Sequence, residues 1–370
     1  MNSSRNCDSD SGVEFEEDGF GVFTDKRTGV TSPVRRFTWK NRNNVNVQVV
    51  TYGATITSIK LPGVDGKIDD IVMGFDNVDG YLNPLNPYFG ATVGRVANRI
   101  GLARFTIEGH TYQVTANSGR HTLHGGLRGF DKVNWNHHVE GTKVVLSYLS
   151  MDGDEGFPGD VVANVSFDLT DDNEFLVDFK ATCTKPTYVN LTNHSYFNLA
   201  GHGKGADELY KHVVTINSDR TTEVDCDSIP TGKLLPVAGT VFDLRVPKVL
   251  GDVIHKIPGY DGFDHNFCIN KGSKQENTFA AKVFHPPSGR AMEVYTNQPG
   301  VQFYCSNFIP EKNSVDKLNG KDGVPYYKHG ALCLETQNWP DAINHKNFPP
   351  AVLNPGEQYH HTVVYKFFVN

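Results

Sequence analysis

Alternating hydrophobic and polar positions are the dominant pattern of this 370-residue chain from Phe20 onward. The alternation is clearest in two consecutive runs, each with an apolar residue at every second position: Ala163, Val165, Phe167 and Leu169, then Phe175, Val177, Phe179 and Ala181. A period of two is typical of strands with one buried face. The five residues between the runs, TDDNE, have hairpin length and turn-forming composition. We therefore predict an antiparallel pair of strands facing one core.

Seven more segments carry the same strand pattern: 45–51, 56–61, 105–114, 144–149, 213–217, 291–296 and 362–369. The 36 glycines and 19 prolines interrupt the chain often, and no segment sustains the apolar period of a helix over several turns. The best helix candidate is 246–257, which ends before Pro258. This pattern predicts an all-β fold with few short helices, a large antiparallel sandwich or barrel formed by residues 20–370 as a single domain. A two-lobed sandwich is the alternative, and a single domain is the more economical interpretation.

Charge is concentrated at the beginning of the chain. The formal net charge is −7, and residues 1–19 carry six acids against Arg5, a local charge of −5 that leaves about −2 for the rest. We expect residues 1–19 to be a disordered acidic leader. The near-neutral body has no clustered basic run, so nucleic acid and anionic membranes are not expected partners. A neutral small molecule such as a sugar fits better.

The cysteines and the hydropathy favour a cytoplasmic protein. Six cysteines are scattered singly, without a CxxC pair or dense spacing, so we expect free thiols. The N-terminal residues lack the apolar region of a signal peptide, and no apolar stretch reaches the length of a membrane span.

The run NLTNHSYFNLAG, residues 190–201, combines imidazole, amide, hydroxyl and aromatic groups in one short segment. His194 has the near-neutral pKa that proton transfer requires, and its neighbours offer hydrogen bonds to a polyhydroxylated ligand. A polar strand edge with a structural histidine is the alternative interpretation.

Polar residues interrupt the strand pattern in four other places. Arg95, Asn98 and Arg99 lie in GATVGRVANRI, and His124 precedes two glycines in HTLHGG. Asp264 lies in the turn-like GYDGFDHNF. These groups suit hydroxyl recognition, although a surface turn with an ion pair, a turn histidine and an Asx-turn explain each segment separately.

The fourth place holds a carboxylate. Glu335 follows an apolar run and precedes Thr336, Gln337 and Trp339. A buried glutamate has a raised pKa and can act as a general base. Upstream, Gln302 lies between apolar neighbours, as an outward-pointing strand residue also would.

Several chemistries lack their motifs. His121 and His124 have no third metal ligand at a recognisable spacing, there is no HExxH, and the Asp264 region lacks the spacing of a calcium loop. No GxSxG, Walker loop or strand-linked GxGxxG occurs. We therefore expect no metal and no nucleotide cofactor.

Taken in order, the motifs GRVANRI, LHGGLRGFDKVNW, NLTNHSYFNLAG, GFDHNF, PGVQFY and LETQNWPDA resemble the aldose 1-epimerase family. The resemblance covers residues 47–368. It implies a β-sandwich of the galactose-mutarotase-like type and an isomerase of galactose and glucose metabolism that needs no cofactor. It also implies a catalytic pair, Glu335 as base and His194 as acid. The sugar-contacting positions that it implies are Asn98, Arg99, His124, Asp264 and Gln302.

This chemistry suits the residues. Opening a cyclic hemiacetal requires one group to take the proton of the anomeric hydroxyl and another to protonate the ring oxygen. Spacing alone leaves both His124 and His194 open as the acid, and the resemblance favours His194. We expect small aldoses as partners and a monomeric enzyme.

Three other functions remain alternatives. A sugar-binding module would not need Glu335 and His194 together. A glycoside hydrolase would need a carboxylate pair about 5–10 Å apart, for which Glu335 and Asp264 are the candidates. An epimerase of phosphorylated hexoses would need extra basic residues for the phosphate.

Overall fold

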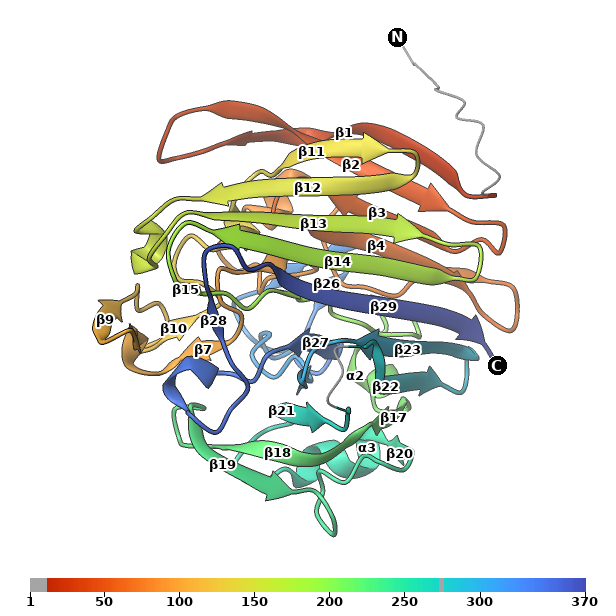
Figure 1. Ribbon diagram of the computed structural model, residues 1–370. Coiled ribbons are helices and arrows are strands. Elements are labelled where there is room, and N and C mark those ends of the chain that lie inside the picture. Colours follow the sequence, from red (N-terminus) through yellow and green to blue (C-terminus); the bar gives the residue numbers. More distant parts are fainter. Residues whose placement is uncertain (1–11, 273–275) are drawn as a thin grey trace.

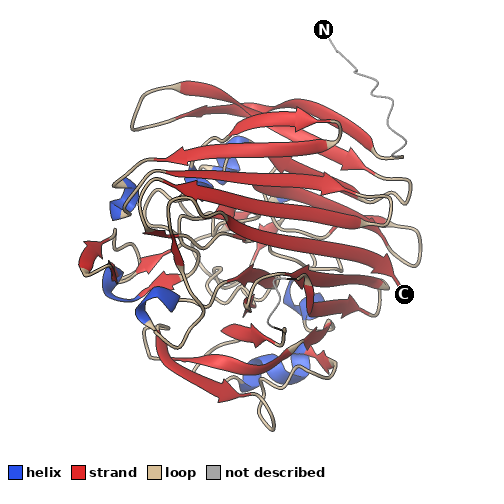
Figure 2. Ribbon diagram, in the orientation of Figure 1, coloured by secondary structure: helices blue, strands red, loops and turns tan. Residues whose placement is uncertain are grey.

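Strands dominate the computed structural model, which describes residues 12–272 and 276–370 (Figure 1 and Figure 2). The largest sheet has nine strands, and all its neighbouring pairs are antiparallel. In sheet order they are β11 (Asn136–Glu140), β12 (Lys143–Ser150), β13 (Val161–Leu169), β14 (Glu174–Cys183), β29 (Tyr359–Val369), β23 (Arg290–Thr296), β22 (Thr278–His285), β17 (Val213–Ile216) and β20 (Lys248–Val249). The predicted hairpin is confirmed as β13 and β14, with Phe167 opposite Val177.

Two five-stranded sheets complete the main architecture. The first contains β1 (Glu14–Thr24), β2 (Thr31–Lys40), β3 (Asn46–Val50), β4 (Thr55–Pro62) and β5 (Ile68–Asp70). The second, called the site sheet below, contains β19 (Pro230–Pro236), β18 (Ser218–Val224), β21 (Asp264–Ile269), β24 (Gly300–Tyr304) and β27 (Cys333–Gln337).

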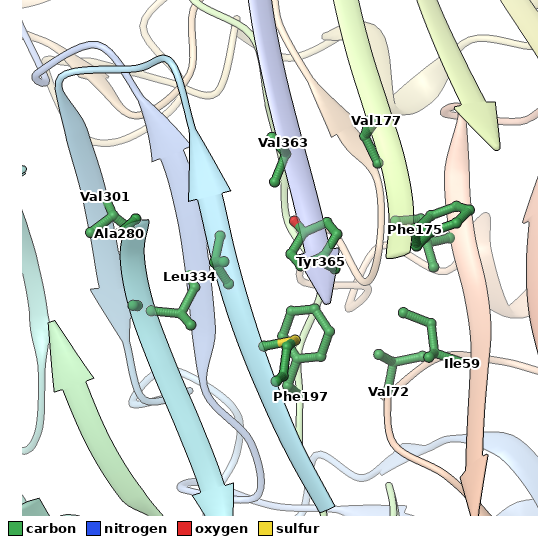
Figure 3. Packing of buried hydrophobic residues seen from close by; sticks show 14 of the residues in the cluster. Ile59, Val72, Phe175, Val177, Phe197, Ala280, Val301, Leu334, Val363 and Tyr365 are labelled. Atoms are coloured by element: carbon green, nitrogen blue, oxygen red, sulfur yellow. The ribbon is translucent and has the colours of Figure 1, made fainter. Parts of the chain in front are cut away.

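Both smaller sheets share a core with one face of the large sheet. Trp39 of β2 packs edge-on against Phe175 of β14, with ring centroids 6.0 Å apart. Phe175 lies opposite Tyr365 of β29, so these two side chains belong to the same face of the large sheet. Figure 3 shows Tyr365 in the same core as Val301 and Leu334 of the site sheet. The predicted antiparallel β-sandwich is therefore confirmed.

Short elements connect these sheets. The α-helices are α1 (Val78–Tyr81), α2 (Gly205–Leu209) and α3 (Leu250–Val253), and none within the described ranges is long and apolar enough to cross a membrane. The two-stranded ribbons pair β6 (Thr92–Val93) with β16 (Thr192–Asn193), β7 (Arg99–Ile100) with β10 (Thr122–Leu123), β8 (Arg104–Ile107) with β9 (His110–Gln113), β15 (Thr187–Tyr188) with β28 (Val352–Leu353), and β25 (Leu318–Asn319) with β26 (Pro325–Tyr326).

Two predicted elements are shorter than expected. The expected helix over 246–257 is helical only from Leu250, since Lys248 and Val249 form β20. The expected strand over 105–114 is a hairpin of β8 and β9. It turns at Glu108 and Gly109, which both have a positive φ, and such a turn matches the twist of the flanking strands.

The prediction of a disordered leader over 1–19 is wrong for its last residues, and residues 1–11 lie outside the described ranges. Glu14–Gly19 form the first part of β1, which pairs with β2. Glu17 accepts a hydrogen bond of 2.8 Å from Arg35 Nε, and Asp18 pairs with Arg36. The acidic run is ordered because the neighbouring strand supplies the opposite charge and backbone partners.

Candidate active site

The site sheet has one apolar face and one polar face, and both are buried. On β24 and β27 the side chains of Val301 and Leu334 enter the core, so the alternating residues Gln302 and Glu335 occupy the opposite face. Gln302 lies directly opposite Glu335 in the antiparallel register. Glu335 therefore stands in the middle of a strand.

Asp264 joins this polar face from β21. Its Oδ1 atom accepts a 2.7 Å hydrogen bond from Gln302 Nε2. Its Oδ2 atom lies 3.8 Å from Arg99 Nη2. The two contacts hold the carboxylate of Asp264 with an amide on one side and a guanidinium on the other.

Segment 190–196 runs along the free edge of β27 and carries His194 to the site. The hydroxyl of Thr192 donates to the carbonyl of Thr336, at 2.8 Å, and Asn193 pairs with Thr92 of β6. These contacts place His194 Nε2 at 3.6 Å from Glu335 Oε2. The side chains of both residues are almost fully buried, at 5% and 3% exposure.

Aromatic rings and a fixed turn hold the imidazole of His194. Tyr196 stacks on it with ring centroids 4.9 Å apart, and Tyr88 lies nearly parallel on it at 5.9 Å. Asn193 accepts hydrogen bonds from the backbone and hydroxyl of Ser195 and donates to Gly90. Asn193, Ser195 and Tyr196 therefore support the imidazole instead of binding a ligand directly.

The β7–β10 ribbon supplies Asn98, Arg99 and His124. Because Leu123 pairs with Arg99, the backbone N–H of Asn98 donates to Nδ1 of His124 at 3.2 Å. A side chain at Gly125 would meet the carbonyl oxygen of Gly94 at 2.0 Å, so only glycine allows this close turn. The ring of His124 lies 5.2 Å from that of His194.

All seven predicted site residues thus connect into one cluster, but other candidates from the same motifs do not join it. The guanidinium of Arg95 is buried and donates to backbone carbonyls, including those of Ser150, Pro158 and Gly159. His121 bonds to Leu102 and Asp227 instead. Arg95 and His121 are therefore structural residues.

Burial changes the protonation of the acid–base pair. Removal from water lowers the pKa of His194 to about 3. Burial, reinforced by the nearby charge of Asp264, raises the pKa of Glu335 well above its ordinary value, while Arg99 opposes this shift. Burial therefore favours the neutral form of each group, an uncharged imidazole and a protonated carboxyl group. Burial and neighbouring cations also hold the pKa of His124 well below its ordinary value.

The nitrogen and oxygen atoms of His124, His194 and Glu335 lie within 4.8 Å of one another. The sequence showed no third ligand for a metal, and the fold brings one in Glu335. Two imidazoles and a carboxylate are a ligand set that zinc accepts. The prediction that the site works without a metal stays a prediction.

A separate surface cavity of about 580 Å³ is lined by His202, Tyr210, Tyr326 and His329 among others. None of the seven site residues lines it. Its position away from the imidazole–carboxylate pair makes it a poor candidate for the chemistry.

Sequence reasoning missed three polar or aromatic side chains of the site. Tyr88 faces His194, and Asn266 and Gln337 alternate with core residues on β21 and β27. The spacing of Asn266 from Asp264, and of Gln337 from Glu335, was the available signal, because residues two apart on a strand share a face.

Comparison with known proteins identifies the family. A family model described as aldose 1-epimerase matches residues 35–366. The chain is 48% identical over 327 residues to galactose mutarotase of Bos taurus, covering 88% of this chain and 92% of that protein. It is 36% identical to aldose 1-epimerase of Escherichia coli K12, covering 90% and 95%.

Solved structures agree with this assignment. An aldose epimerase homologue from C. elegans superposes with a TM-score of 0.80 at 31% identity, covering 89% of this chain and 97% of that one. Galactose 1-epimerase from Lactobacillus acidophilus, at 23% identity, has the same fold with a TM-score of 0.79 over 97% and 99% of the two chains. The chain belongs to the aldose 1-epimerase family.

Proposed function

We propose that this protein is an isomerase that interconverts the α and β anomers of free aldoses such as galactose and glucose. The observation that carries this proposal is the buried pair of His194 Nε2 and Glu335 Oε2, 3.6 Å apart, surrounded by hydroxyl-binding side chains. Relatives named galactose mutarotase and aldose 1-epimerase at 36–48% identity support it.

In the proposed reaction a proton first passes from Glu335 to His194. Glu335 then takes the proton of the anomeric hydroxyl while His194 delivers its proton to the ring oxygen. The ring opens to an aldehyde. Rotation about the bond between C1 and C2 presents the other face of the carbonyl, and reclosure with the two groups in reversed roles gives the opposite anomer. The pair starts and ends with a single shared proton.

The remaining predicted residues hold the sugar. Asp264, fixed by Gln302 and Arg99, accepts hydrogen bonds from hydroxyl groups distant from C1. His124 accepts a backbone N–H at Nδ1, so its neutral ring presents Nε2–H as a donor. Holding the distant hydroxyls leaves C1 free to rotate.

The direct test is polarimetry of freshly dissolved α-galactose and α-glucose with and without the protein. We expect the protein to accelerate the approach to the anomeric equilibrium of both sugars. Release of sugar from a galactoside would instead support a hydrolase, and sugar binding without acceleration would support a binding module.

The pH profile of kcat/KM is expected to extend further toward acid pH than two ordinary groups would allow. The active form has one proton on the pair. If Glu335 and His194 had their ordinary pKa values, activity would be lost below about pH 4.3 and above about pH 6.5. Because burial lowers the pKa of His194 to about 3, a second proton binds to the pair only at a lower pH. Because burial raises the pKa of Glu335, its proton is lost only above the ordinary pH range of a glutamate.

Polarimetry corrected for the spontaneous reaction should therefore show activity that persists at about pH 4 and an acidic limb near pH 3. Circular dichroism at each pH controls for unfolding. Limbs at the two ordinary values would contradict the shared-proton site.

A cytoplasmic location, a role in galactose and glucose metabolism, and a monomeric enzyme are parts of this proposal. The five described cysteines are free, which favours a reducing compartment. All seven site residues come from one chain, so the proposed site needs no second copy. Sedimentation of the purified protein tests the monomer.

A further inference from the structure

Two buried amides on the site sheet have no hydrogen-bond partner among the described residues. Asn266 is 2% exposed and Gln337 is fully buried. Neither the nitrogen nor the oxygen of either side-chain amide makes a hydrogen bond within the described residues, and Oε1 of Gln302 is also unpaired. A buried amide without partners destabilises the protein, so a fold keeps such groups mainly where a ligand or water uses them.

These amides lie beside the proposed base. Asn266 is opposite Gln302, which is opposite Glu335, so the three side chains form one row across β21, β24 and β27. Gln337 follows Glu335 on the same face of β27 and pairs with Gly300.

Because Gly300 has no side chain, neighbouring side chains can lie directly above this part of the sheet. A Cβ atom there would lie 2.5 Å from Asn266 Oδ1 and 2.9 Å from Cδ1 of Trp339. The amide of Asn266 therefore extends over the glycine, and the half-buried indole of Trp339 borders the same space.

The order of groups across the sheet indicates which part of the sugar faces the amides. Glu335 has His194 on one flank, from the segment beside the edge of β27, and Gln302 and Asn266 on the other. In an aldopyranose C1 is bonded to the ring oxygen and to C2. With His194 at the ring oxygen and Glu335 at the anomeric hydroxyl, C2 lies on the flank of Gln302 and Asn266.

We propose that Asn266, with Gln337 and the free carbonyl of Gln302, binds the 2-hydroxyl of the aldose and so determines specificity for sugars that carry it. This inference rests on the proposed function for the placement of C1. It also suits the reaction, because a hydrogen-bonded 2-hydroxyl fixes C2 while the aldehyde at C1 rotates about the bond between them.

The test compares galactose with 2-deoxygalactose in the wild type and in Asn266→Leu. The wild type should have a kcat/KM about tenfold or more higher for galactose, because the deoxy sugar leaves the buried amide unpaired. Asn266→Leu should lower kcat/KM for galactose about tenfold and leave that for 2-deoxygalactose nearly unchanged. Its melting temperature should not fall, since the amide loses no protein partner.

Asn198→Leu is the matched control. Asn198 is equally buried, but its amide bonds to Gly330, Gly205 and Ala200. Its loss should lower the melting temperature without changing the preference between the two sugars. Should Asn266→Leu fail to fold, Asn266→Ser provides the same comparison. An unchanged preference in the Asn266 variant, or equal losses for both sugars, would overturn the assignment.

Calorimetric titration with both sugars separates the two proposals. If the wild type does not catalyse anomerisation but binds galactose more tightly than 2-deoxygalactose, and Asn266→Leu removes that difference, the hydroxyl site stands and the proposed function fails. If anomerisation is catalysed and neither binding nor kcat/KM distinguishes the sugars, the hydroxyl site fails and the proposed function stands.

Discussion

Glu335→Gln is expected to lower the rate of anomerisation by at least ~10²-fold while the protein stays folded. Glutamine has nearly the shape of glutamate but cannot take the proton of the anomeric hydroxyl. The side chain is buried. Its Oε2 atom lies near His194 and has no hydrogen-bond partner in the part of the chain that the structure describes. Glutamine also has no proton to pass to His194, so the acid of the pair loses its proton donor.

Polarimetry of α-galactose at neutral pH measures this effect, with circular dichroism and calorimetric titration of galactose to show that fold and binding persist. Asp168→Asn is a suitable control, because Asp168 is a half-buried carboxylate on β13 that bonds to Thr142, away from the site. It should leave the rate unchanged. A Glu335→Gln protein with the wild-type rate would remove Glu335 from the reaction.

The fold class could be predicted from local pattern because each strand of the sandwich buries one face. The alternation over 163–169 and 175–181 follows from that burial, and the structure pairs these residues as expected. Order at the N-terminus could not be predicted the same way. Residues 14–19 are strongly acidic, and a strand there becomes favourable through pairing with β2, whose Arg35 and Arg36 supply opposite charge.

The site was only partly visible in the sequence, for a physical reason. Its residues come from separate strands and loops, and only tertiary contacts bring His194 to Glu335. Each polar motif therefore suggested a surface turn as readily as a ligand contact. Arg95 is the opposite case. Its motif suggested contact with a sugar, but its guanidinium donates hydrogen bonds to backbone carbonyls.

Asn266 and Gln337 were missed because single strands do not reveal that both faces are buried. All residues of β21, β24 and β27 are buried, with the core on one side and the segments carrying His124 and His194 on the other. In a sheet with one solvated face these amides would point into water. Here they face the site, which becomes apparent only when the covering segments are placed.

His194→Asn is expected to reduce kcat by at least ~10²-fold, whereas His124→Asn should mainly raise KM. The two imidazoles differ in what they can do with a proton. Nδ1 of His124 accepts a hydrogen bond from the backbone N–H of Asn98. A proton on that nitrogen would point at this N–H, and the hydrogen bond would be lost. Nδ1 of His194 has no hydrogen-bond partner within 12–272 and 276–370, and its Nε2 atom lies 3.6 Å from the carboxyl group of Glu335.

Steady-state polarimetry of both variants with α-galactose, over a range of sugar concentrations, separates kcat from KM. Asparagine retains polar groups at both positions, so a large fall in kcat reports lost proton transfer more than lost hydrogen bonding. If His124→Asn lost kcat and His194→Asn kept it, the acid would be His124. The ring oxygen would then lie on the β10 side of Glu335, and the flank assigned to C2 would change with it.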